Sequence, residues 1–247
     1  MSPKRLLAIE LVKFKAPVNY ISLGIYLFLM LVVAIFTIGN SATFSVGGED
    51  TGATSGNVLS LQMSFMRLLM AIIIILNIGK EFATGTVKKN IIDGYRRSDW
   101  LTGKVLASFV IYISIFVFGL LIYFTTGSMV EGIDEAYKNY PLESILRDFI
   151  VYFYYTGLIL AIALITRSIA LSFIIYLFIG LVEFIINLGL NKILSTELDY
   201  RSYLPSGSVQ HLQSVPLDNV WNLLWPACYF VLFLSIPYFL FTRKDLK

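Results

Sequence analysis

The chain has 247 residues, of which 57% are hydrophobic and only 14% are charged, and its mean hydropathy is +0.76. A soluble domain carries about 25% charged residues, so we expect part of this chain's surface to face lipid instead of water. The formal net charge of +3 is too small to indicate nucleic acid as a partner, and the lone Cys228 and His211 exclude an intramolecular disulfide and any metal site built from several cysteines or histidines.

The first apolar run, residues 18–38, follows a basic stretch that contains Lys4, Arg5, Lys13 and Lys15. A secretory signal peptide has the same order of basic and apolar segments. This run of about 20 residues is longer than the apolar part of a signal peptide, and no small-x-small cleavage pattern closes it. We therefore expect a retained membrane helix.

Five further apolar runs are about as long as a membrane-spanning helix, which needs about 20 residues at 1.5 Å per residue. Only Arg167 and Ser168 separate the fourth of the six runs from the fifth. One helix of their combined length would be far too long for a single crossing, so we expect a tight turn there. The sequence predicts an all-α integral membrane protein, one transmembrane domain over residues 1–247, with six spanning helices at about 18–38, 58–79, 104–124, 149–166, 169–190 and 220–241.

Lysine and arginine are unevenly distributed between the predicted loops. With the N-terminus inside, the inner segments hold fourteen of the nineteen Lys and Arg residues and the outer segments hold four, while Arg67 lies within a helix. Cytoplasmic loops carry the excess of Lys and Arg in membrane proteins. Both ends are therefore expected in the cytoplasm, and the chain in the inner (cytoplasmic) membrane of the cell.

Two of the predicted outer loops are long enough to carry structure of their own. The loop at 125–148 is acidic, and we expect a short interfacial helix near Pro141. The loop at 191–219 contains Pro205, Gly207 and Pro216, and its length would let it fold back onto the membrane.

The inner loop at 79–100 has an amphipathic pattern. Val87, Ile91 and Tyr95 fall at i, i+4 and i+8 and so share one face of a helix, which Ile92 widens. We expect a helix at about 86–97, capped by Thr84 or Thr86 and ended or bent by Gly94. The pattern leaves two interpretations open. Such a helix can lie in the membrane interface with its basic face toward lipid headgroups, or it can dock onto a cytoplasmic partner.

A set of residues in and after this loop forms a recognisable motif: Glu81, Gly85-Thr86, the run Lys89-Asn90-Ile91-Ile92-Asp93-Gly94, Arg97 and Gly103-Lys104. The motif resembles the coupling-helix region of the ABC-2 type transporter permeases. In that family a Glu, a Gly-Thr pair, an apolar helix, an Arg and a later Lys lead into the third spanning helix. The stretch 7–13 is also similar to the family's amphipathic N-terminal helix at the membrane surface. Arg96 departs from the pattern, because similar proteins usually have Ser there.

The resemblance implies that the helix at 86–97 inserts into a groove on a separate nucleotide-binding subunit and transmits the motion that ATP binding causes. Six helices form half a pore, so two permease copies, or one copy and a homologous permease, are expected with two ATPase subunits. The residues expected to couple to the ATPase are Glu81, Gly85, Thr86, Val87, Lys88, Lys89, Ile91, Ile92, Asp93, Tyr95, Arg96 and Arg97.

The chain has no G-x-x-x-x-G-K-[ST] phosphate loop of its own. Gly79-Lys80 is followed by Glu81, Gly103-Lys104 is followed by Val105, and neither pair has a glycine five residues before its own glycine. No cofactor is therefore expected to bind this chain directly. ATP and Mg would be held by the partner subunit.

Ionisable groups inside predicted helices are costly in a membrane, about 2.5 kcal/mol or more at its centre. Arg67 lies in the second predicted helix and Glu183 in the fifth, both in the outer half of the bilayer, with Asn187 one turn from Glu183. We expect Arg67 and Glu183 to pair. The pair would serve either as a brace between helices or as a gate that contacts substrate.

The sequence favours the permease subunit of an ATP-driven exporter whose substrate (peptide, lipid or drug-like molecule) is not readable. A transporter driven by an ion gradient needs buried acidic residues near the midplane, and only Glu183 qualifies. An intramembrane enzyme would need clustered catalytic side chains, and the predicted helices of this chain do not have them. A membrane immunity or structural protein remains a further alternative.

Overall fold

The computed structural model describes residues 55–130, 132–194, 203–205, 207–209 and 220–243, with single residues at 10, 21, 24, 25, 28 and 32. All regular structure in these parts of the chain is helical. The predicted surface helix at 7–13, apart from Glu10, lies outside the described residues. So do His211 and the predicted first span at 18–38, apart from five positions.

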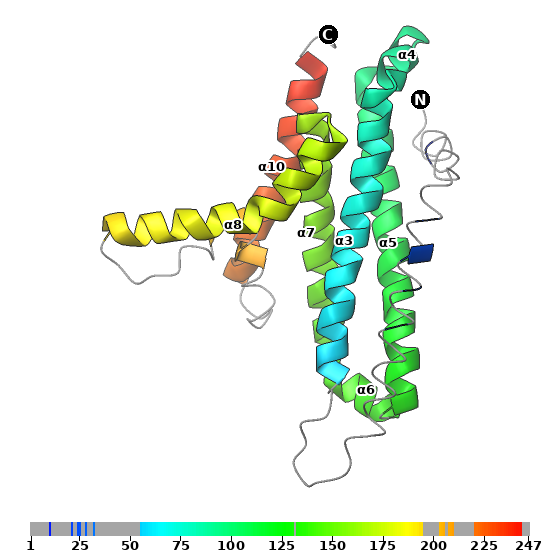
Figure 1. Cartoon of the computed structure of the whole chain (residues 1–247), viewed down its shortest axis with the longest axis vertical. Helices are drawn as coiled ribbons and strands as arrows, with labels where there is room; N and C mark the ends of the chain where they lie inside the picture. The colour runs from blue at the N-terminus through cyan, green and yellow to red at the C-terminus, as the bar shows by residue number, and fades with distance from the viewer. Residues whose placement is uncertain are drawn as a thin grey trace.

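Long helices that run side by side form most of the molecule (Figure 1). The bundle consists of α3, α5, α7 and α10, whereas α8 leans away from it and its second half projects sideways. Short α4 lies at the same end of the bundle as the C-terminus, and short α6 lies at the other end. We call these the α4 end and the α6 end. The helices are α3 (Ser55–Ala83), α4 (Thr86–Ile92), α5 (Arg97–Val130), α6 (Ile133–Asn139), α7 (Leu142–Thr166), α8 (Ile169–Leu194) and α10 (Val220–Arg243).

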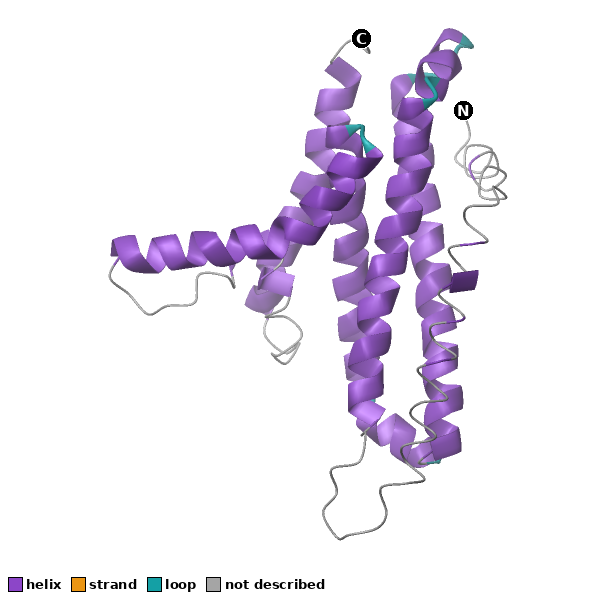
Figure 2. Ribbon diagram, in the orientation of Figure 1, coloured by secondary structure: helices purple, strands orange, loops and turns teal. Residues whose placement is uncertain are grey.

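Four of these helices, α5, α7, α8 and α10, are long and apolar enough to cross a membrane. A fifth candidate is the second part of α3 taken together with α4, although the two are bent by 64° at the break between them. The described turns between α3 and α4, between α4 and α5, and between α7 and α8 are short (Figure 2). The prediction of an all-α, multi-pass membrane protein is therefore confirmed.

Two helices extend well beyond the predicted spans. α5 begins at Arg97 instead of residue 104, and α7 begins at Leu142 instead of residue 149. Their first turns carry polar residues, including Asp99 and Glu143. Hydropathy identifies only the part of a helix that matches the hydrocarbon, so polar helical turns outside it were assigned to loops.

The tight turn predicted between the fourth and fifth runs is present. Arg167 ends α7 in the left-handed conformation, at φ 55° and ψ 17°, and its N–H donates to the carbonyl of Ala163 at 3.1 Å. Ser172 closes the start of α8, since its N–H and its hydroxyl both donate to the carbonyl of Ser168. The chain thus reverses with its backbone groups satisfied, as a buried helix end requires.

The core of the bundle is centred on α7, which packs against α3, α5, α8 and α10. Tyr152, Ile159 and Leu160 of α7 are fully buried. In contrast, α8 and α10 expose most of their apolar side chains, among them Leu177 and Val231. Apolar surface of this extent is unfavourable in water and favourable against lipid tails, which agrees with a membrane location.

The helix expected near Pro141 precedes that residue. α6 ends at Asn139, and Pro141 is the N-cap residue of α7. Tyr140 joins the two helices: it is buried, and its hydroxyl donates to a carboxylate oxygen of Asp148 at 2.5 Å. Burial raises the pKa of Tyr140, and the nearby Asp148 carboxylate raises it further. Tyr140 therefore stays protonated, and its hydrogen bond to Asp148 fixes α6 to the first two turns of α7.

Gly79 lets the turn before α8 approach α3 closely. A Cβ atom on Gly79 would lie 2.5 Å from Cγ1 of Ile169 and 3.3 Å from its backbone nitrogen. Because Ile169 is the first residue of α8 and is β-branched, neither its side chain nor its backbone can move away without disturbing the turn. Gly180 of α8, in contrast, has open space around the position of its missing Cβ.

We predict that Gly79→Ala lowers the free energy of unfolding by about 1–3 kcal/mol, the usual cost of overpacking. The matched variant Gly180→Ala should raise it by up to about 1 kcal/mol, because alanine favours a helix over glycine. Thermal unfolding of the purified protein in detergent measures both. Equal unfolding midpoints in the two variants would contradict the close packing of α3 against α8.

Candidate functional site at the α4 end of the bundle

The start of α4 is set by backbone geometry. Gly85 is the N-cap residue, at φ 68° and ψ 8°, in the left-handed region that glycine adopts readily. No side chain caps the helix: the Thr84 hydroxyl donates to the carbonyl of Lys80 at 2.9 Å and lies 2.7 Å from the Thr86 hydroxyl. The predicted Thr84 or Thr86 cap is therefore wrong, because the Thr84 hydroxyl instead caps the end of α3.

The end of α4 is set by Gly94, at φ 97°. Its N–H donates to the carbonyl of Ile91 at 3.1 Å, and the N–H of Tyr95 donates to the carbonyl of Asn90 at 3.0 Å. These two bonds form a Schellman motif, which stops a helix. The helix predicted at 86–97 therefore ends at Ile92, as a correction to the sequence-based boundary. Tyr95 and Arg96 lie in the turn, and Arg97 begins α5.

The two faces of α4 have different surroundings from those predicted. Val87 is only 1% exposed and packs in the core, and half-buried Ile91 packs against the same core. The face expected to meet a partner therefore anchors α4 to its own chain. Ile92 is 83% exposed, and it lies among exposed polar and charged residues, which are Lys88, Lys89, Asp93 and Arg96.

Beneath α4, a buried ion cluster joins three segments. The Lys104 ammonium of α5 lies 2.5 Å from a carboxylate oxygen of Glu10 and 2.8 Å from one of Glu81 in α3. The indole N–H of Trp100 donates to the other Glu81 oxygen at 2.9 Å. All four residues are buried, and the Lys104 ammonium lies 5.7 Å from the centroid of the Trp100 ring.

The cluster holds its charges because every one of them is paired. A buried ion is costly unless an opposite charge and hydrogen bonds replace its lost water, and Lys104 provides both for Glu10 and Glu81. Within the described parts of the chain, no group of three or more His, Cys, Asp or Glu residues could hold a metal ion. The paired charges of the cluster fix the positions of the three segments that supply them.

Sequence reasoning had singled out Glu81 and Lys104 but had not predicted their contact. Glu10 lay in the stretch compared with the family's surface helix, 94 positions before Lys104. Glu81 lies two residues after one apolar run, and Lys104 begins the next. Their opposite signs at neighbouring helix ends could have suggested that pair, whereas no signal in the sequence indicated Glu10.

An aromatic cluster lies beside the ion cluster. Trp100 of α5 stacks on Phe241 of α10 at 4.9 Å between ring centroids, and Phe82 of α3 meets both rings edge-on. The Arg167 guanidinium, in the turn between α7 and α8, lies 5.7 Å from the centroid of Phe82 and 6.0 Å from that of Phe241. Cation–π contacts of this kind are favourable at such distances. We call the ion cluster and the aromatic cluster together the α4-end junction.

The structure describes a side-chain contact for Arg67 and another for Glu183, the two ionisable residues predicted inside the membrane. The Arg67 guanidinium lies 5.4 Å from the centroid of the Tyr155 ring. Glu183 is 5% exposed, and one of its carboxylate oxygens accepts a hydrogen bond from the N–H of Gly207 at 3.1 Å. Asn187 is half-buried. A direct contact between Arg67 and Glu183 stays a prediction.

The backbone group that Glu183 binds belongs to the predicted outer loop at 191–219. The sequence indicated only that this loop was long enough to fold back onto the membrane. Residues 203–209, as far as they are described, pack against three helices. The Tyr154 hydroxyl of α7 donates to the carbonyl of Pro205 at 2.6 Å, and the Tyr229 hydroxyl of α10 donates to the carbonyl of Tyr203 at 2.6 Å. This part of the predicted 191–219 loop therefore folds back against the helices, and side-chain donors and acceptors satisfy its backbone.

A comparison with protein families matches residues 27–247 to the family described as "Protein of unknown function (DUF2705)". The chain belongs to this family. The match covers α3 to α10, and so includes α4, Glu81 and Lys104, whereas Glu10 lies before it. A comparison with curated proteins found no match. The DUF2705 description names no activity, so function has to be argued from the site itself.

We predict that Lys104→Met lowers the free energy of unfolding by about 3–5 kcal/mol, because it leaves two buried carboxylates without their cation. Replacing the carboxylates as well, in Lys104→Met with Glu10→Gln and Glu81→Gln, should recover part of that loss. Unfolding in detergent measures both variants.

Glu143→Gln is the matched control for this prediction. Glu143 forms an ion pair with Arg147 at 2.7 Å, but its side chain is 56% exposed. An exposed pair contributes about 0–1 kcal/mol. A loss in Lys104→Met no larger than the loss in Glu143→Gln would show that the buried cluster does not hold the helices together.

Proposed function

We propose that this chain is the permease subunit of an ATP-binding cassette exporter of the ABC-2 type. It would lie in the inner membrane of the cell, with six spanning helices and both ends in the cytoplasm. The observation that carries the proposal is α4, a seven-residue helix at the end of the bundle with an exposed Ile92 surrounded by charge. In this topology the α4 end faces the cytoplasm.

The connections of α4 support a mechanical role. Only Thr84 and Gly85 separate it from α3, and the turn at 93–96 separates it from α5. Glycines with positive φ fix both turns, and Val87 anchors the helix in the core. A short helix held at three points transmits displacement to its neighbours instead of yielding, so a push on α4 would move the ends of α3 and α5.

The α4-end junction would carry that displacement further. Glu81 lies in the last turn of α3, before α4, and Lys104 and Trp100 follow α4 on α5. Phe241 and Arg167 connect the same place to α10 and to the turn before α8. Packed interiors pass strain on because they contain few voids. Motion of α4 would therefore reach every helix that ends at the junction.

The partner would be a nucleotide-binding subunit with a phosphate loop, present in two copies and holding ATP and Mg. A second permease copy, or a homologous permease, would complete the pathway. The partner's groove would have an apolar pocket for Ile92 and acidic residues opposite Lys88 and Lys89. This pattern of a buried apolar contact within a charged rim is typical of protein interfaces. The substrate would be a peptide, a lipid or a drug-like molecule.

Glu183 favours a second candidate, a transporter driven by an ion gradient. It is a buried carboxylate in a helix apolar enough to span a membrane, and such residues mark ion pathways in pumps and transporters. Its bond to Gly207 equally fits a structural role. Transport in vesicles separates the candidates, because an ATP-driven exporter works without a gradient, whereas a secondary transporter stops when an ionophore removes it.

We predict that Ile92→Asp and Lys89→Glu each weaken copurification with the proposed nucleotide-binding ATPase subunit, when the two are coexpressed. A central interface residue contributes about 2 kcal/mol or more, which corresponds to about a 30-fold loss of affinity. Both side chains are exposed, so the permease itself should fold normally.

Lys138→Glu is the matched control, because Lys138 is an exposed lysine on α6 at the other end of the bundle. It should copurify with the ATPase like the wild type. If Ile92→Asp and Lys89→Glu bind the ATPase as the wild type does, while both bind anionic vesicles less well, α4 rests on the membrane surface and the exporter proposal fails.

A further inference from the structure

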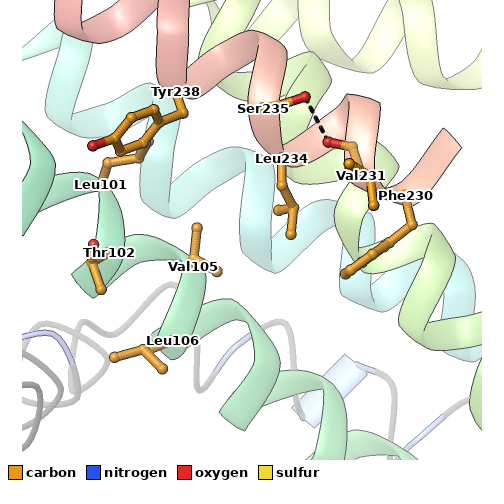
Figure 3. A pocket seen from close by; sticks show the side chains of 9 residues that line it. All are labelled: Leu101, Thr102, Val105, Leu106, Phe230, Val231, Leu234, Ser235 and Tyr238. Atoms are coloured by element: carbon orange, nitrogen blue, oxygen red, sulfur yellow. Dashed lines mark hydrogen bonds between the residues drawn. The ribbon is translucent and has the colours of Figure 1, made fainter. Parts of the chain in front are cut away.

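A groove of about 440 Å³ lies between α5 and α10, close to the α4 end (Figure 3). Side chains from the two helices face each other across it, with Leu101 opposite Tyr238. Its volume falls within the range of about 300–1,000 Å³ typical of ligand pockets. The groove is lined by Leu101, Thr102, Val105 and Leu106 of α5 and by Phe230, Val231, Leu234, Ser235 and Tyr238 of α10.

Pro237 interrupts α10 beside this groove. It lies inside the helix, between Ser235 and Tyr238 in the chain. Proline has no N–H, so the carbonyl of Phe233 loses its helical donor, and the proline ring pushes against the preceding turn. Prolines inside helices are a common cause of bends. Pro237 therefore interrupts the regular hydrogen bonding of α10 beside the groove.

The chemistry of the walls selects a hydrocarbon occupant. Six of the nine lining residues are aliphatic or phenylalanine. Two of the three hydroxyl groups donate within their own helices: Thr102 to the carbonyl of Ser98 at 2.8 Å, and Ser235 to the carbonyl of Val231 at 2.7 Å. The hydroxyl protons of Thr102 and Ser235 are therefore already donated to backbone carbonyls and are not directed at a ligand in the groove. In a bilayer, the apolar molecule that reaches such a lateral groove is a lipid tail.

The dimensions agree with one acyl chain. Positions 230–238 of α10 extend about 12 Å along the helix at 1.5 Å per residue. Half of the hydrocarbon core is about 15 Å thick. A tail that enters from the leaflet at the α4 end would therefore lie along most of the groove before reaching the bilayer centre.

Charge at the mouth of the groove favours an anionic headgroup. Arg97 begins α5, one turn before Leu101, and exposed Arg96 precedes it in the chain. Asp99 is the acidic residue in the first turn of α5, so the two arginines predominate there. Basic residues near a membrane surface attract anionic lipid.

We propose that the α5–α10 groove binds one acyl chain of an anionic phospholipid from the leaflet at the α4 end, with its phosphate at the arginine-rich mouth. This lipid site is independent of whether α4 docks onto an ATPase. It would lie next to the Trp100–Phe241 stack of the junction, since Leu101 follows Trp100 directly.

The test uses the purified full chain and native mass spectrometry, titrated with phosphatidylglycerol or with phosphatidylcholine of the same tails. The groove-filling variants are Val105→Trp and Leu234→Trp. The control is Leu232→Trp, an exposed position on α10 outside the groove. We expect the two groove-filling variants to bind phosphatidylglycerol about tenfold more weakly than the wild type, and the control to bind it as the wild type does. The wild type should prefer phosphatidylglycerol over phosphatidylcholine by about fivefold or more. Unchanged binding in the filled variants, or equal binding of both lipids, would overturn the proposal.

A measurement on the wild type covers the case in which the tryptophan variants do not fold. Phosphatidylglycerol with a photoreactive group in its acyl chain is crosslinked to the protein, and the labelled peptides are mapped. We expect label concentrated at 101–106 and 230–238 over the exposed apolar face of α8, which includes Leu177 and Leu181. Uniform labelling of all three surfaces would indicate bulk lipid only and would overturn the proposal. So would a groove protected from label because the chain's own residues 18–38 or a second copy fills it.

Discussion

Lys104 holds two carboxylates in a place from which water is largely excluded, and the arrangement of the helix ends depends on that contact. Its ammonium brings Glu10, from the N-terminal segment, and Glu81, from the end of α3, to the same point on α5. Removing the Lys104 charge would leave both carboxylates buried without their cation. The ion cluster therefore specifies where α3 and α5 lie at this end, whereas apolar packing, which has no direction, could accommodate several registers.

The position of α4 follows from the same place. Gly85 lies at the 64° bend between α3 and α4, and Gly94 lies in the turn between α4 and α5, so that α4 leaves the axis of α3 and returns to α5 within a few residues. Burial of Val87 then determines which face points outward. Because the apolar face is used for attachment, the large apolar side chain of α4 that stays exposed is Ile92, in a charged rim. The charged rim makes such a surface compatible with water, whereas burial of its one apolar side chain would be favourable.

Further along the bundle, polar side chains form hydrogen bonds with the backbone of a non-spanning segment. A backbone segment that packs against membrane-spanning helices must find donors and acceptors for its own groups, because lipid offers none. Glu183, Tyr154 and Tyr229 provide them for residues 203–209 from three different helices. A carboxylate that is costly as an isolated charge is thus used as an acceptor for a backbone N–H, and the tyrosine hydroxyls serve as the donors.

The sequence by itself determined that this is a helical membrane protein, where most spans lie, that the chain turns at Arg167, and that a short helix follows the second predicted span. Those features depend on hydrophobic length and on local signals at single glycines or charges, which sequence contains directly. Tertiary structure alone decided that Val87 faces inward, that Glu10 meets Lys104, and that Glu183 bonds Gly207. These contacts join residues far apart in the chain, and whether an apolar face meets a partner, lipid or the chain's own core depends on neighbours that periodicity does not name.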